Sequence, residues 1–321
     1  RRVVASLRVM PAEPDAAPPH GQEAVDELLV VLALERIEEN IYRGHHPRGG
    51  LARTFGGQTA AQALVAAART VDPDRSIHSL HSYFLRPGDP TLPTVFQVDR
   101  IRDGSSFSMR RVHGIQHGKP IYSFAASFQR PETGFDHQDA MPDVPEPESL
   151  PTFTEVLAPY ADRMPISSAL ASTIDMRAID PHPFVQRDIG PRDEARHRVW
   201  MRAAGRLPDD SVVHASMLAY MSDVSLLHPV LAKHGVSFSL DPIMGASLDH
   251  ALWFQRPFRA DEWLLYDAMS PSAIGARGLA MGRLFSRDGR LVAAVVQEGL
   301  VRQANPERLA AMTARHNPLR G

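Results

Sequence analysis

The 321-residue chain contains no cysteine. This absence excludes disulfides, thiolate metal ligands and a cysteine nucleophile. It also fits a reducing compartment, so we expect the protein in the cytoplasm. Basic and acidic residues nearly cancel, at 35 and 37, and no basic stripe predicts nucleic acid as a partner. No apolar run approaches the roughly 18–20 residues that a membrane span requires, so we expect a globular protein without one.

Several catalytic motifs are also missing from the sequence. The chain has no G-x-S-x-G elbow, which disfavours a serine enzyme of the α/β-hydrolase type. It has neither H-E-x-x-H nor a cluster of cysteine and histidine, which disfavours a zinc hydrolase. Phosphate-binding loops of the G-x-x-x-x-G-K-[ST] and G-x-G-x-x-G kinds are missing too. We therefore expect no metal site and no cofactor.

A break in composition divides the chain near its middle. Residues 131–151 are rich in proline and acidic side chains and lack periodicity, which is typical of a linker. We therefore predict a flexible tail at 1–24, a first domain at 25–130, a linker at 131–165, a second domain at 166–303 and a C-terminal tail at 304–321.

The two sides of this break show the same order of predicted elements. On the first side a strand and a helix precede four strands, at 34–44, 56–71, 76–86, 93–102, 105–116 and 120–130. On the second side the order repeats, at 196–204, 212–233, 244–256, 263–269, 278–286 and 291–302. The stretch from Tyr83 to Pro87 also matches the stretch from Trp253 to Pro257, which fits duplication of one unit.

This order of elements predicts an α+β fold of the hotdog kind. A helix that is apolar on every side must be buried. We therefore predict a double hotdog, in which two antiparallel sheets each wrap around a long buried helix. A generic pair of α+β domains remains the alternative.

Asp223 lies within the most apolar predicted helix. An ionised carboxylate in such surroundings is costly unless it has partners. It can serve as a general base whose pKa is raised by burial. It can equally mark a helix break, or an N-cap that satisfies free backbone N–H groups. The spacing of the residues leaves both interpretations open.

Polar residues also interrupt two predicted strands of the second unit. Gln297 can bind water or a substrate carbonyl through its amide, although a satisfied core amide explains it equally well. Ser247 can orient a water molecule, although serine is common in strands. Asp249 and His250 resemble an acid–base couple, but adjacent strand residues face opposite sides of a sheet, so both stay minor candidates.

Gly57 and Gln58 open the predicted helix of the first unit. We place them at the position that Asp223 holds in the second unit. Glycine permits close backbone approach, and a helix N-terminus offers N–H donors to a bound substrate. A tight turn between strand and helix is the simpler explanation of the glycine.

Five stretches together resemble the acyl-CoA thioesterase II family. They are FGGQTAAQAL (55–64), HSLHSYFLRPGD (78–89), IRDGSSFSMRRVHGIQHGKPI (101–121), LDHALWFQRPFRADEWLLY (248–266) and VVQEGLVR (295–302). The resemblance extends over residues 25–303 and implies a double hotdog that hydrolyses fatty acyl-CoA to free fatty acid and coenzyme A. It also implies a homo-oligomer, either a dimer or a tetramer.

The same resemblance implies a catalytic set of Asp223, Ser247 and Gln297 around a nucleophilic water. Serine stands here where a bacterial relative has threonine. It keeps the hydroxyl but loses the methyl group that stiffens χ1, so we expect the role to survive with a less rigid rotamer.

Acyl-CoA is then the expected substrate, and arginine is the side chain best suited to its phosphates. Arg86, Arg256 and Arg277 are the candidates, although any single arginine is more often a solvated surface residue. Two other functions remain open. A hotdog enoyl-CoA hydratase needs an Asp/His pair, for which His214 lies too far before Asp223. A non-catalytic acyl-CoA binder needs no intact catalytic set.

Overall fold

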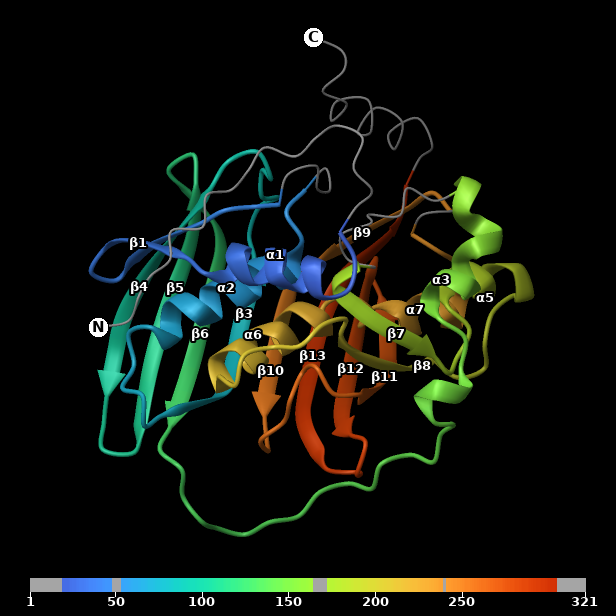
Figure 1. Cartoon of the computed structure of the whole chain (residues 1–321). Coiled ribbons are helices and arrows are strands. Elements are labelled where there is room, and N and C mark those ends of the chain that lie inside the picture. The colour runs from blue at the N-terminus through green and yellow to red at the C-terminus, as the bar shows by residue number, and fades with distance from the viewer. Residues whose placement is uncertain (1–18, 48–52, 164–171, 239–240, 305–321) are drawn as a thin grey trace.

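One antiparallel sheet runs through the computed structural model, which describes residues 19–47, 53–163, 172–238 and 241–304. Its strand order is β1-β2-β4-β5-β6-β3-β10-β13-β12-β11-β8-β7, and β9 pairs with β13 beside this path (Figure 1). The strands are β1 (Glu35–Glu38), β2 (Ile41–Gly44), β3 (Ser76–Phe84), β4 (Thr94–Asp103), β5 (Phe107–Gln116), β6 (Lys119–Gln129), β7 (Ile174–Ala178), β8 (Arg196–Ala203), β9 (Ile243–Ser247), β10 (Asp249–Phe254), β11 (Leu264–Ile274), β12 (Arg277–Ser286) and β13 (Leu291–Gln303).

Helices lie against the sheet and on its edges. They are α1 (Gln22–Leu32), α2 (Gly56–Ala68), η1 (Pro147–Ser149), α3 (Phe153–Leu157), η2 (Ala158–Arg163), α5 (Pro183–Ile189), α6 (Ser211–Ser222) and α7 (His228–His234). Within the described residues, none of these helices is long and apolar enough to cross a membrane.

The two predicted sheets are joined edge to edge. β3 of the first half pairs antiparallel with β10 of the second, with Leu80 opposite Leu252. Both leucines are completely buried, so the core continues across the joint. The predicted α+β fold is confirmed. The pairing of β3 with β10 joins the two predicted sheets into one continuous sheet, and each half has a central helix, α2 or α6.

The central helices α2 and α6 pack against each other on one side of the sheet. Alanine dominates the buried face of α2, and small side chains let two helices approach closely. The prediction of one apolar helix over 212–233 is wrong in one respect. α6 ends at Ser222, α7 begins at His228, and Asp223 lies at the break between them. Pro229 near the start of α7 explains the interruption, because proline lacks an N–H and clashes with the preceding turn.

The segment predicted as a strand at 34–44 is a hairpin instead. β1 and β2 pair through a tight turn at Asn40, which adopts a positive φ of 61°. Asparagine tolerates this left-handed conformation better than most residues. α1 also begins at Gln22, inside the predicted tail, whose residues 1–18 lie outside the described ranges, as does 305–321 of the C-terminal tail.

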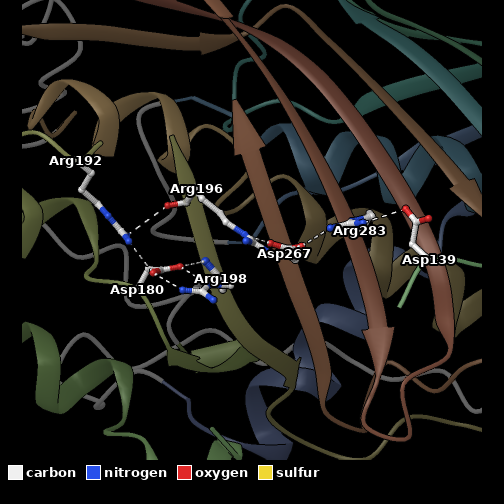
Figure 2. A network of polar contacts seen from close by, with 7 residues as sticks. All are labelled: Asp139, Asp180, Arg192, Arg196, Arg198, Asp267 and Arg283. Atoms are coloured by element: carbon white, nitrogen blue, oxygen red, sulfur yellow. Dashed lines mark hydrogen bonds and ion pairs between the residues drawn. The ribbon is translucent and has the colours of Figure 1, made fainter. Parts of the chain in front are cut away.

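The predicted linker has neither helix nor strand over 131–146, and its Met141 and Val144 pack against a buried cluster of the second half that includes Trp200 and Phe285. Pro145 O accepts the Trp200 indole N–H at 2.9 Å. Figure 2 shows Asp139 of this segment next to Arg283, which also binds Asp267 in the neighbouring strand. These contacts attach the linker to the second half.

Candidate active site

Asp223, Ser247 and Gln297 meet in the second half of the molecule. The Ser247 hydroxyl donates to Asp223 Oδ1 at 3.0 Å, and Gln297 Nε2 donates to Ser247 Oγ at 2.8 Å. The three come from the end of α6, from β9 and from β13. Gly299 of β13 lies opposite Ser247 in the ladder, so the pairing of these two strands sets the spacing. The structure thus brings together all three residues predicted as catalytic.

A fourth residue contacts this set from the first half of the chain. α2 has Phe55 at its N-cap, whose side chain makes no capping hydrogen bond. The backbone N–H of Gly57 instead hydrogen-bonds the Asp223 carboxylate. This carboxylate therefore caps α2 across the boundary between the halves, where the positive end of the helix dipole stabilises an anion.

Two glycines make this approach possible. A Cβ atom at Gly56 would lie 2.6 Å from Asp223 Oδ2, and one at Gly57 would lie 2.4 Å from the backbone oxygen of Tyr220. Close backbone approach, rather than a special φ angle, therefore explains the glycine pair. The predicted equivalence of Gly57 with Asp223 is wrong, because Gly57 begins a central helix whereas Asp223 ends one.

Burial raises the pKa of the Asp223 carboxyl above its usual range, although the residue keeps partial exposure. The charge of His250 opposes this rise, and so do hydrogen bonds from Ser247 and Gln297. The Gly57 N–H acts in the same direction. Desolvation prevails, so the carboxylate holds a proton more readily than a solvated aspartate does.

The hydrogen-bonded chain continues into the core through His250. Its Nδ1 lies 2.5 Å from Gln297 Oε1, and its Nε2 lies 2.9 Å from Ser222 Oγ. Asp249, by contrast, accepts the backbone N–H of Glu298 at 2.7 Å. Strand alternation therefore separates the two minor candidates and directs His250 alone toward the site.

Two sequence profiles match the chain: the acyl-CoA thioesterase family matches residues 170–300, and the acyl-CoA thioesterase N-terminal domain matches residues 43–129. Acyl-coenzyme A thioesterase 8 of Homo sapiens is 40% identical over 300 residues, which cover 90% of this chain and 92% of the human protein. Acyl-CoA thioesterase 2 of Haemophilus influenzae is 37% identical over 287 residues, which cover 87% of this chain and 98% of that protein.

The crystal structure of the acyl-CoA thioesterase II TesB2 from Mycobacterium marinum is also similar. Its TM-score is 0.72 at 46% sequence identity, over 87% of this chain and 98% of that one. The chain belongs to the acyl-CoA thioesterase family. The resemblance found in the sequence is thereby confirmed, and the two profile matches fall on either side of the linker.

Gln58, predicted to contact the substrate, is buried and turned away from Asp223. Its amide lies 2.8 Å from His46 Nδ1 and donates to His45 O at 3.3 Å. Gln58 therefore attaches α2 to the chain that follows β2. Its predicted contact with substrate stays a prediction.

The three arginines predicted to bind coenzyme A have partners within the protein. Arg86 donates to Pro120 O at 2.5 Å, and Arg277 donates to Glu298 at 2.9 Å on an exposed surface. Arg256 binds Leu291 O at 3.0 Å and also contacts Asp136 of the linker. It follows the C-terminal end of β10, whereas the site adjoins the other end of that strand. Phosphate binding by these arginines stays a prediction.

Proposed function

We propose that the protein hydrolyses acyl-CoA thioesters with a water molecule activated by Asp223. Family membership supports the reaction, and the geometry around Asp223 supports the mechanism. The observation that carries it is a carboxylate of raised pKa held by Ser247, Gln297 and a helix N-terminus. Such a group is a better proton acceptor than a solvated aspartate while it still ionises.

In this mechanism Asp223 takes a proton from water as the water oxygen bonds to the thioester carbonyl carbon. Ser247 and Gln297 fix the carboxylate and the water. The positive end of α2 lies beside the site, so its backbone N–H groups stabilise the developing oxyanion. The C–S bond then breaks, the coenzyme A thiolate leaves and takes up the proton held by Asp223, and the acid product forms. No covalent intermediate with the enzyme is needed.

Asp223→Asn tests this role. We expect kcat to fall roughly 10²–10⁴-fold, the usual contribution of a general base. In the wild type, kcat should rise with pH through a pKa above the ordinary aspartate value, because only the ionised carboxylate accepts a proton. Asp209→Asn, an exposed site just before α6, is the matched control. Near wild-type turnover by Asp223→Asn would rule out the assignment.

An enoyl-CoA hydratase finds less support. His214 lies at the beginning of α6, at the opposite end from Asp223, and its Nδ1 accepts the Ala260 N–H at 3.1 Å. A parallel assay of enoyl-CoA hydration separates the two reactions. Stoichiometric acyl-CoA binding without turnover would favour the non-catalytic binder. The cytoplasmic location and the homo-oligomer stay predictions.

A further inference from the structure

His250 connects the proposed catalytic residues to the core. It lies in β10, between β3 and β13, and it is completely buried. Both imidazole nitrogens have polar partners, Gln297 Oε1 at 2.5 Å and Ser222 Oγ at 2.9 Å. Because both partners of this buried imidazole are known, the donors and acceptors around it show which nitrogen carries a hydrogen.

The Gln297 amide determines which nitrogen of His250 is protonated. Gln297 Nε2 donates to Ser247 Oγ at 2.8 Å, and the same side chain hydrogen-bonds Asp223. Its oxygen therefore faces His250. An amide oxygen only accepts, so His250 Nδ1 must carry a hydrogen.

The reversed amide would leave these groups mismatched. Its oxygen would then face the Asp223 carboxylate and the Ser247 oxygen. Ser247 has a single hydroxyl hydrogen, which it already donates to Asp223. A hydrogen on His250 Nδ1 therefore selects the orientation in which each donor of this group meets an acceptor.

Ser222 allows this arrangement in both charge states of the ring. Its Oγ lies 2.9 Å from His250 Nε2 and 3.2 Å from Ala219 O. Beside a neutral imidazole, the hydroxyl donates to Nε2. Beside an imidazolium it accepts from Nε2–H and donates to Ala219 O. Nδ1 keeps its hydrogen in both cases, so the amide orientation does not depend on the charge of His250.

We propose that His250 is a positioning residue for thioester hydrolysis. Its Nδ1–H holds the Gln297 amide so that the amide N–H groups face Ser247 and Asp223, where the attacking water binds. The place of the water rests on the function proposed above. The coupling of His250 to Gln297 rests on the hydrogen bonds alone.

Two substitutions of His250 test the position of the hydrogen. Asparagine places an amide nitrogen near the position of Nδ1, whereas leucine places no donor there. We expect His250→Leu to lower kcat roughly 10- to 10²-fold with little change in KM, since small misplacements of positioned groups cost up to about 10²-fold. His250→Asn should recover most of that loss. His81→Leu, an exposed histidine on the neighbouring strand, should keep wild-type kcat.

A double-mutant cycle with Gln297→Leu tests whether His250 acts through the amide. If it does, His250→Leu lowers kcat no further in a Gln297→Leu background. Multiplicative losses in the cycle would overturn the proposal. So would wild-type kcat in His250→Leu, or an equal loss in His250→Asn.

Should His250→Leu fail to fold, His250→Gln replaces it. Glutamine carries its amide nitrogen near the position of Nε2, so it should be impaired where asparagine is not, and equal kcat values for the two would overturn the proposal. The cycle measures only the coupling of His250 to Gln297. Asp223→Asn measures the base, so either idea can fail without the other.

Discussion

At the residue scale, both interpretations of Asp223 that the sequence left open, a helix cap and a general base, fit the structure. As a cap it satisfies the Gly57 N–H at the start of α2, and as a candidate base it has a raised pKa. The cap belongs to a helix of the other half, not to the helix that carries Asp223. Because the same carboxylate does both, the approach of α2 sets its position as well as its proton affinity.

Two glycine substitutions should separate the effect on the placement of Asp223 from the effect on the free energy of unfolding. Gly57→Ala forces Cβ against the Tyr220 backbone oxygen, so we expect a loss of about 1–3 kcal/mol in unfolding free energy together with low activity. Gly56→Ala meets two side chains instead of backbone, the Asp223 carboxylate and the Phe84 ring. There the helix propensity of alanine, about 1 kcal/mol, offsets the crowding, and kcat falls roughly 10- to 10²-fold.

Chemical denaturation and steady-state kinetics on the two variants measure these effects. Equal unfolding free energies for Gly56→Ala and Gly57→Ala would contradict the distinction, and so would full activity in Gly56→Ala.

Some of these residue contacts could be predicted from sequence and others could not. Ser247, Gln297 and Asp223 stand in short motifs, and strand alternation already required that only one of Asp249 and His250 face the site. The contact of Gly57 with Asp223 joins residues 166 positions apart. It depends on how two helices pack, which neither motif nor periodicity encodes.

At the scale of elements, three histidines form a buried cluster where α5, α7 and β8 meet. The His228 ring lies 4.9 Å from that of His182 and 5.0 Å from that of His197, between ring centroids. Burial lowers the pKa of His182 to about 3 and that of His197 to about 4, and it lowers that of His228 strongly. The folded protein therefore holds these rings neutral at neutral pH.

This cluster predicts sensitivity to acid. Below pH 6.5, the ordinary pKa of histidine, the unfolded chain binds protons that the folded cluster does not. The free energy of unfolding therefore falls as pH decreases from about 6.5 toward 4. At pH 5 the loss is about 2 kcal/mol for each of His182 and His197. Urea denaturation at several pH values measures the slope.

His182→Asn should flatten that slope. Asparagine does not titrate, and it can still cap α5 as His182 does for the Phe184 N–H. His234→Asn, an exposed position at the end of α7, should keep the wild-type slope. An unchanged slope in His182→Asn would contradict a role for the cluster in acid sensitivity.

The order of elements was largely predictable, because apolar periodicity and turn residues are local signals. In the first half, α2 and the four strands that follow it lie within a few residues of their predicted bounds. The predicted strand at 244–256 divides into β9 and β10, so that Ser247 pairs with β13 whereas His250 pairs with β3. Sheet pairing produces that division, and a run of strand-forming residues does not indicate it.

At the scale of the whole molecule, the site lies where the two halves meet. β3 pairs with β10, α2 packs on α6, and Asp223 of the second half accepts the backbone N–H of Gly57 in the first. The linker contributes to none of these contacts. Its anchors at Asp136 and Asp139 bind the second half, so residues 131–135 alone connect the first half to that anchored segment.

Cutting the chain at residues 132–135 should therefore leave the enzyme assembled. Phe135 is fully exposed and Gly134 has open space around it, so a protease site placed there is accessible. We expect the cleaved halves to co-elute in gel filtration and to keep the kcat of the intact chain, since the buried joint holds them together. Separation of the fragments, or loss of activity on cleavage, would mean that the linker and not the joint maintains the site.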